Sequence, residues 1–324
     1  TDPRVVDAAA RAAREYGAGA GAARLITGDC PLNAAVEEKL ATMKGLPACR
    51  LFGSGYLANI GVIPALVGRG DYIAIDERAH ACLHAGATLS GARTEQFRHN
   101  DVDDARRALK IRGAGRALVL TETIFSMDGD AAPLRALGDL CDDMGAWFMT
   151  DDAHGFGVAK IDNPAAIQAG TLSKAVGAYG GYVCGPTPLV ELLTSRARSF
   201  VYATALPPPV LGAAVAALEI IDAEAWRGEK ARAHAALFAS LVGAPAPAAA
   251  IVPVIVGDAD RALQISDRLA DRGFLATAIR PPTVPDGTAR LRFTFSALHQ
   301  ENDVRALAAA TADAITTGRE RPRR

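Results

Sequence analysis

Short apolar runs alternate with longer amphipathic stretches along this chain from about residue 36 onward. Apolar runs of about 4–8 residues that are bounded by turn residues are typical of buried strands, and the amphipathic stretches are typical of helices. The pattern predicts strands at ACRLF (48–52), YIAID (72–76), RALVLTE (116–122), AWFMT (146–150) and GYVCG (181–185). Strands that alternate with helices indicate an α/β fold with a mostly parallel central sheet flanked by helices.

A second, smaller pattern follows residue 240. Prolines 207–209 precede an alanine-rich helical stretch over roughly 210–240, and GAPAPAAA (243–250) has the composition of a linker. Beyond it, we expect a small α+β domain from IVPVIVG (251–257), a helix near 259–272, GFLATAI (273–279), ARLRFTF (289–295) and a final helix. The predicted organisation is an N-terminal segment (1–35), a large domain (36–240) and a small C-terminal domain (241–324).

Composition and charge exclude several classes of protein. With 35 basic and 36 acidic residues the net charge is −1, so no basic surface for nucleic acid is indicated. Five scattered cysteines without a CxxC pair argue against a disulfide framework or a structural zinc site, and are typical of a reducing cytoplasm. No apolar run approaches the roughly 18–20 residues of a membrane span, and no signal peptide is recognisable. The chain opens without Met, so we expect processing or truncation at its N-terminus.

One lysine has unusual neighbours. Lys174 lies in GTLSKAVGAYGG (170–181), between hydroxyl residues and a run of glycine and alanine. A solvated lysine usually has polar neighbours on a helix face, whereas these residues favour small size and backbone freedom. We infer that another molecule approaches this amine closely.

Asp151 follows the predicted strand AWFMT directly. A carboxylate at a buried strand end costs several kcal/mol unless it is paired. It could cap the next helix, or bind a metal with His154, although no further cluster with ligand spacing supports the metal. The third partner is a protonated heteroaromatic nitrogen. A Schiff-base lysine and an aspartate at the ring nitrogen are the two groups that pyridoxal phosphate (PLP) needs, so Lys174 and Asp151 together predict a PLP site.

A PLP site makes demands at other strand ends. The phosphate needs backbone N–H donors at a helix start, which GSGY (53–56) offers, and Thr171 could add a donor. His80 follows YIAID and could stack on the ring, while Ser126 in TETIFSMDGD could bond its phenolic oxygen. Each residue alone is more often structural. At consecutive strand ends they indicate one site, because ligands of such sheets bind at the carboxyl ends of the strands.

Together these residues resemble the α-oxoamine synthase family of PLP-dependent enzymes, which have fold type I, over nearly the whole chain. The resemblance is carried by GSGYLANIGVIPAL (53–66), DERAHACLHAGATLSGA (76–92), FRHNDVDD (97–104), TETIFSMDGDAAPL (121–134), TDDAHGFGV (150–158), GTLSKAVGAYGGY (170–182) and YATALPP (202–208). The family implies a homodimer whose active sites are shared between subunits. Relatives carry a further upstream segment, and a longer glycine-rich connection where this chain has IDNPAAIQA (161–169).

The resemblance implies a role for each residue of the cofactor site. Lys174 is the Schiff-base lysine, Asp151 pairs with the pyridine nitrogen, and His80 stacks on the ring and helps to polarise the acyl carbonyl. The remaining residues contact the cofactor's oxygens. His154 and Ser126 lie near the phenolic oxygen, Gly55, Tyr56 and Thr171 hold the phosphate, and Thr204 reaches the phosphate of the partner subunit.

The C-terminal stretch AIRPPTVPDGTARLRFTFSALH (278–299) discriminates among family members. It resembles the biotin-pathway branch, an acyltransferase that condenses L-alanine with a pimeloyl thioester, carried on CoA or on a carrier protein. By that likeness Thr283 lies in the substrate pocket. A guanidinium suits a bidentate carboxylate, and we choose Arg292 for the amino acid. Arg290 shares its strand face and is the alternative.

Other functions stay open. Another α-oxoamine synthase, such as 5-aminolevulinate synthase or 2-amino-3-ketobutyrate CoA ligase, is the nearest, and a fold type I aminotransferase is more distant. A catalytically silent subunit would be expected to lack Lys174. GAGAGA (17–22) matches a dinucleotide-binding pattern, but it follows a helical stretch instead of a strand, so a loop is favoured.

Overall fold

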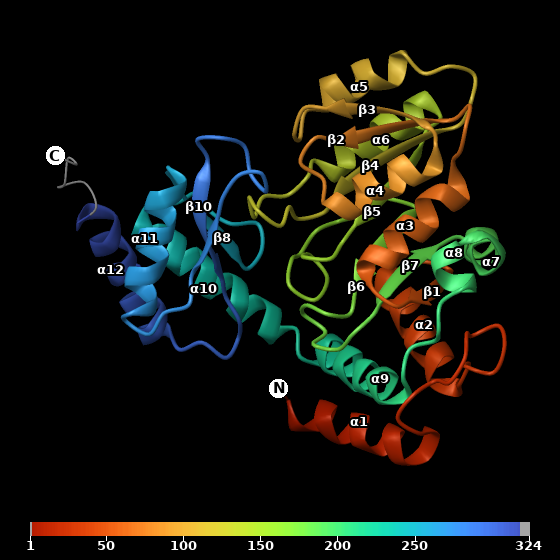
Figure 1. Cartoon of the computed structure of the whole chain (residues 1–324), viewed down its shortest axis with the longest axis horizontal. Coiled ribbons are helices and arrows are strands. Elements are labelled where there is room, and N and C mark those ends of the chain that lie inside the picture. The colour runs from red at the N-terminus through yellow and green to blue at the C-terminus, as the bar shows by residue number, and fades with distance from the viewer. Residues whose placement is uncertain (1, 318–324) are drawn as a thin grey trace. The chain divides into compact units, whose positions relative to one another are not determined.

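The computed structural model describes residues 2–317, and contacts divide the chain into two compact units (Figure 1). The first unit takes in residues 1–123 and 132–224, and the second takes in residues 124–131 and 225–324. Among residues 2–317, no helix combines the length and the apolar character needed to cross a membrane.

Seven strands of the first unit form one sheet in the order β1-β7-β6-β5-β4-β2-β3. β7 is antiparallel to β1 and β6, and the other neighbours are parallel, so the sheet is mostly parallel, as predicted. The strands are β1 (Ala48–Phe52), β2 (Tyr72–Asp76), β3 (Arg93–Phe97), β4 (Ala117–Glu122), β5 (Trp147–Asp151), β6 (Ile167–Thr171) and β7 (Gly181–Gly185).

Two of these strands, β3 and β6, were not predicted from the pattern of apolar residues. β3 is an edge strand with the sequence RTEQF, and only its last residue is buried, so it contains no apolar run. β6 is buried throughout, but its sequence IQAGT includes a glutamine and a glycine. Both strands are held by pairing with their neighbours, which hydrophobic periodicity does not register.

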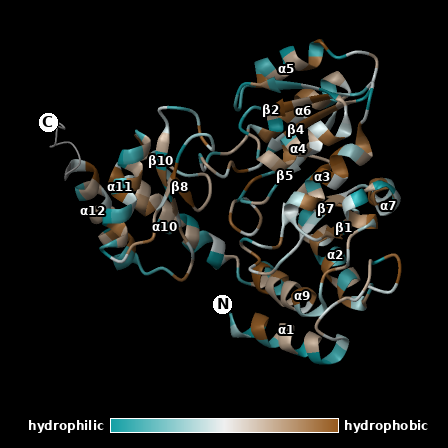
Figure 2. Cartoon of the chain, in the orientation of Figure 1, coloured by the Kyte–Doolittle hydropathy of each residue, from teal (hydrophilic) through white to brown (hydrophobic). Residues whose placement is uncertain are grey.

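Helices cover both faces of this sheet. Successive residues of β7 belong to different buried clusters, since Val183 packs with one set and Tyr182 and Cys184 with another. Side chains alternate between the faces of a strand, so each cluster fills one face. Figure 2 accordingly shows hydrophobic residues through much of the interior of the sheet, although the edge strand β3 is hydrophilic. The helices are α1 (Pro3–Tyr16), α2 (Pro31–Lys44), α3 (Gly55–Leu66), α4 (Ala81–Ser90), α5 (Val102–Lys110), α6 (Leu134–Met144), α7 (Thr187–Arg196), α8 (Arg198–Val201) and α9 (Pro208–Ala223).

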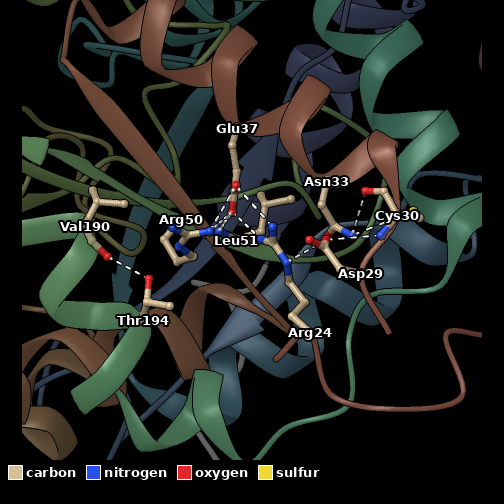
Figure 3. A network of polar contacts seen from close by, with 9 residues as sticks. All are labelled: Arg24, Asp29, Cys30, Asn33, Glu37, Arg50, Leu51, Val190 and Thr194. Carbon is tan, nitrogen blue, oxygen red and sulfur yellow. Dashed lines mark hydrogen bonds and ion pairs between the residues drawn. The ribbon is translucent and has the colours of Figure 1, made fainter. Parts of the chain in front are cut away.

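A polar network ties the start of this unit to its sheet (Figure 3). Glu37 on α2 accepts hydrogen bonds from Arg24 Nη1 at 2.5 Å, from Arg50 Nη1 at 3.3 Å and from the backbone N–H of Leu51 at 2.8 Å. The loop that carries Arg24 also pairs with the segment before α9, where the Ala205 N–H donates to Ala22 O at 3.0 Å. One buried carboxylate therefore joins α2, β1 and this loop.

The second unit is built on a three-stranded antiparallel sheet of order β8-β10-β9. Its strands are β8 (Ile251–Gly257), β9 (Thr277–Ile279) and β10 (Ala289–Thr294), and its helices are α10 (Trp226–Val242), α11 (Ala259–Ala270) and α12 (Glu301–Thr317). Phe238 on α10 packs against the rings of Phe293 and Phe295, with centroids 4.5 and 5.2 Å away. Residues 124–131 belong to this unit, where Gly129 O accepts the Ala248 N–H at 3.2 Å.

The boundary between the units differs in place from the sequence prediction. The single helical stretch expected over 210–240 is two helices, α9 in the first unit and α10 in the second, and the units divide after Glu224. The alanine-rich segment 243–250, interpreted as a linker, lies inside the second unit, where Ala249 and Ala250 are buried. Composition misled here because alanine fits both a flexible segment and a small buried position.

Candidate active site

The carboxyl ends of the parallel strands bring several polar residues of the first unit together. Asp151 ends β5 and is in register with Glu122 at the end of β4. His80 lies just beyond β2 and Lys174 just beyond β6. The charges of Asp151 and Lys174 both act on the pKa of His80, which places the three side chains in one neighbourhood. The predicted convergence of strand ends is therefore present.

Asp151 is buried and has polar but uncharged partners. Its side chain accepts hydrogen bonds from the Ala153 N–H at 2.9 Å and from Asn59 Nδ2 at 2.7 Å. Within the described part of the chain it forms no ion pair, although the residue is only 5% exposed. A buried carboxylate without a cation is costly, so this position suits a ligand that brings a positive charge. A protonated pyridine nitrogen meets that requirement.

The neighbouring Asp152 already has its cation. Its carboxylate is paired with the Nζ of Lys44 and accepts a hydrogen bond from the Thr123 hydroxyl. The Lys44 amine also lies 4.8 Å from the centre of the Phe156 ring. Of the two adjacent aspartates, Asp152 is therefore held by an internal ion pair and Asp151 faces the strand-end site.

His80 is positioned as the cap of α4. Its Nδ1 accepts the backbone N–H of Cys82 at 3.2 Å and lies 2.9 Å from the Cys82 Sγ. Burial lowers the pKa of His80, the charge of Asp151 opposes this and that of Lys174 adds to it. The ring is therefore neutral near pH 7, and because Nδ1 is an acceptor its proton lies on Nε2.

An anion site is built at the start of α3. The Ser54 hydroxyl caps the helix by accepting the Leu57 N–H at 3.1 Å. The backbone N–H groups of Gly55 and Tyr56 have no acceptor among residues 2–317, and a helix N-terminus favours negative charge. A Cβ at Gly55 would lie 3.1 Å from the Thr171 Cβ, so the Thr171 side chain contacts this turn. These groups fit a phosphate.

Lys174 is accessible. Its side chain is exposed, and its amine forms no hydrogen bond or ion pair with the described residues. The backbone around it makes a tight turn in which the Gly177 N–H donates to Lys174 O at 3.0 Å. The amine is thus available to a carbonyl compound.

Three of the predicted residues, Ser126, Thr283 and Arg292, belong to the second unit. Arg292 Nε donates to Ser126 O at 2.5 Å, and its guanidinium has no carboxylate partner within residues 2–317. Arg290 in contrast is almost fully buried and paired with Asp128 at 2.6 Å. Of these two arginines, only Arg292 lacks a carboxylate partner within residues 2–317, and burial lowers its pKa. Thr283 is exposed.

Two predicted residues lie in loops of the first unit. His154 is half-buried, shortly after β5. Thr204 is exposed and forms an isolated antiparallel bridge with Ala23. The network around Glu37 therefore also holds the segment that carries Thr204.

Sequence reasoning missed Asn59, Cys82 and Glu122. Asn59 is fully buried and donates to Asp151, and Cys82 Sγ lies 3.8 Å from the same carboxylate. Glu122 has one oxygen without a hydrogen bond in the described chain. Burial raises the pKa of Glu122 well above its usual range, and the charge of Asp151 raises it further. The available signal was a lone polar residue in an apolar helix and in an apolar strand.

Comparison with known sequences gives consistent matches. Residues 1–310 match the family of class I and II aminotransferases. The chain is 54% identical over 319 residues to the 8-amino-7-oxononanoate synthase of Methylobacterium radiotolerans, covering 98% of this chain and 85% of that protein. It is 54% identical over 311 residues to the enzyme of the same name from Methylorubrum extorquens, covering 95% and 81%.

Comparison with solved structures confirms the predicted fold. A serine palmitoyltransferase with PLP as an internal aldimine has a TM-score of 0.93 at 27% identity, over 98% of this chain and 84% of that one. The Sphingomonas wittichii serine palmitoyltransferase has a TM-score of 0.91 at 29% identity, over 99% and 85%. The Francisella tularensis 8-amino-7-oxononanoate synthase shares the fold, with a TM-score of 0.81 at 22% identity over 97% and 94%.

Proposed function

We propose that this chain, which belongs to the class I and II aminotransferase family and within it to the 8-amino-7-oxononanoate synthases, condenses L-alanine with a pimeloyl thioester. The products are 8-amino-7-oxononanoate, CO2 and the thiol of CoA or of a carrier protein. The enzymes of this family depend on PLP. The observation that carries the proposal is Asp151: its carboxylate is buried, forms no ion pair within residues 2–317, and lies in the same neighbourhood as His80 and Lys174.

The residues present fit PLP at both of its ends. The first turn of α3 offers the Gly55 and Tyr56 N–H groups to the phosphate, with Thr171 against them. The Asp151 carboxylate would keep the ring nitrogen protonated by its charge. When bound, PLP supplies an electron sink that stabilises negative charge at the Cα of alanine.

Lys174 and His80 would perform the proton chemistry. The Lys174 amine would hold the cofactor through its aldehyde group and, as a free amine, would accept the Cα proton of alanine. The neutral His80 ring would stack on the cofactor without adding charge, and its Nε2–H would donate to the acyl carbonyl.

The substrate and partner assignments rest on the resemblance and on a few contacts. Arg292 is proposed for the alanine carboxylate because its guanidinium has no carboxylate partner in the described chain, and Thr283 for the substrate pocket. Ser126 and His154 are proposed near the phenolic oxygen. Thr204 is proposed for the phosphate of the partner subunit in a homodimer. The five free cysteines support a reducing cytoplasm as the location.

The test maps the lysine that binds PLP. The wild type is incubated with PLP, reduced with borohydride, digested and analysed by mass spectrometry. Lys174→Ala is treated in the same way, as is the control Lys39→Ala, which removes a partly exposed lysine paired with Glu219. We expect the label on Lys174 in the wild type and in Lys39→Ala, and none in Lys174→Ala. A label on another lysine, or no label in the wild type, would refute the site.

The reaction is tested on the same preparations. We expect CoA release from pimeloyl-CoA with L-alanine and little with glycine. Turnover of glycine with succinyl-CoA would assign another α-oxoamine synthase instead. Conversion of the cofactor to its pyridoxamine form without CoA release would assign an aminotransferase.

A further inference from the structure

Asn59 is a polar residue in a helix that is otherwise apolar. It lies on α3, in the sequence GYLANIGVIPAL, and its side chain is fully buried. An amide in this position must satisfy its donors inside the protein, because an unpaired buried donor costs roughly 1–3 kcal/mol. The acceptors of its two N–H groups therefore indicate the structural role of Asn59.

The Asn59 amide joins two parts of the site. Its Nδ2 donates to Asp151 Oδ2 at 2.7 Å and to the backbone O of Gly55 at 3.1 Å, and it lies 3.2 Å from the Cys82 Sγ. Gly55 belongs to the turn that offers its N–H to the phosphate, and Asp151 is the residue at the ring nitrogen. One NH2 group thus contacts the residues at both ends of the proposed cofactor.

We propose that Asn59 is a positioning residue that holds Asp151 against the ring nitrogen of PLP, at a set distance from the phosphate turn. The inference rests on the proposed function, since it assumes that PLP binds here. The amide donor orients the second oxygen of the carboxylate by its hydrogen bond at 2.7 Å. Without it, Asp151 keeps the Ala153 N–H at 2.9 Å and the weaker Cys82 thiol at 3.8 Å as donors in the described chain.

The chemistry of the position explains why an amide is present. Aspartate has almost the same shape, but it would place an acceptor within hydrogen-bond distance of the Asp151 carboxylate, where two charges repel. Alanine would leave Asp151 without its amide donor. Hydrogen bonds to charged groups correspond to roughly a 10- to 100-fold change in an equilibrium constant.

The experiment compares two cofactors on the complete chain. PLP is one, and the other is 1-deazapyridoxal phosphate, in which a C–H replaces the ring nitrogen while the phosphate and aldehyde are unchanged. Dissociation constants of both are measured for the wild type, Asn59→Asp, Asn59→Ala and Asn33→Ala. Asn33 is the matched control, because it is also fully buried and its Nδ2 lies near Cys30 alone, at 3.4 Å from the oxygen (Figure 3).

The ratio of the two dissociation constants decides the outcome. We expect the wild type and Asn33→Ala to bind PLP more tightly than the deaza compound. Both Asn59 variants should lose roughly 10- to 100-fold of that preference. Their affinity for the deaza compound should change by less than about threefold. Equal losses for both cofactors would show a purely structural role for Asn59 and overturn the proposal, as would an unchanged ratio.

Two further results separate the inference from the proposed function. If the wild type binds neither cofactor, the proposed function fails. If the wild type binds PLP but Asn59→Asp keeps the full preference, the positioning role alone fails. Circular dichroism of each variant checks folding, and Asn59→Ser replaces any variant that does not fold, with the same loss of preference expected.

Discussion

Gly181 is the residue whose enlargement should disturb the phosphate turn most directly. It begins β7 and pairs with Phe52 on one side and Thr171 on the other. A Cβ added at Gly181 would lie 2.2 Å from Ser54 O, 2.3 Å from Ser54 C and 2.5 Å from Gly55 N. All three atoms are backbone, so no side-chain rotation relieves the clash. Gly181→Ala must therefore displace the turn itself.

The magnitude follows from this geometry. Carbon atoms in contact normally lie about 3.5–4.0 Å apart, so the turn has to move by roughly an ångström. Overpacking of this kind costs about 1–3 kcal/mol, which lowers the Tm of the apo-protein by roughly 2–12 °C. The displaced N–H groups of the turn would no longer point toward the phosphate. We therefore expect the dissociation constant of PLP to rise at least about tenfold, which corresponds to a loss of about 1.4 kcal/mol in binding free energy.

Gly185→Ala is the matched control, since Gly185 ends the same strand. Its Cβ would lie 2.5 Å from Leu189 Cδ2, a side-chain atom that can rotate away, and 3.2 Å from Ala166 O. We expect a smaller loss of Tm and an unchanged dissociation constant for PLP. The assays are thermal melts without cofactor and PLP titration. If Gly181→Ala binds PLP within twofold of Gly185→Ala, the reasoning about the turn is wrong.

Three further predictions concern stability, substrate and pH. Lys44→Met leaves Asp152 buried without its cation and should cost about 3–5 kcal/mol in denaturant melts, whereas a cost below about 1 kcal/mol would contradict the ion pair's importance. Arg292→Ala should raise the KM for L-alanine at an almost unchanged Tm, and Arg290→Ala should lower the Tm; the reverse pattern would exchange their roles. Burial lowers the pKa of His80 below its usual 6.5 in the folded protein, so on acidification the imidazole is protonated in the unfolded chain before it is protonated in the folded one. The free energy of unfolding that is present above pH 6.5 should therefore decrease as the pH falls below 6.5. Thermal melts of the apo-protein at a series of pH values should show this decrease in the wild type and a smaller decrease in His80→Gln. Parallel curves of Tm against pH for the two proteins would disprove the prediction.

Local pattern was sufficient to predict most of the fold and to propose the central pair of the candidate site. Apolar runs bounded by turn residues correctly predicted β1, β2, β4, β5 and β7, because a strand that is buried on both faces consists mostly of consecutive apolar residues. The unusual neighbours of Lys174 and the strand-end position of Asp151 pointed to PLP before any contact was known. These features are local, so a single sequence records them. β3 and β6 are held by pairing, and the sequence pattern did not show them.

Only the tertiary structure decided which charged residue has which partner. Asp151 and Asp152 are adjacent and alike in sequence, but the cation of Asp152 comes from Lys44, 108 residues away, and the amide at Asp151 comes from Asn59, 92 residues away. Arg290 and Arg292 differ in the same manner, since only Arg290 has a carboxylate partner in the described chain. Residue type and spacing determine which chemistry a side chain offers. Its partner is set by which strands and helices pack together, because a charge far away along the chain becomes a neighbour only when the chain folds.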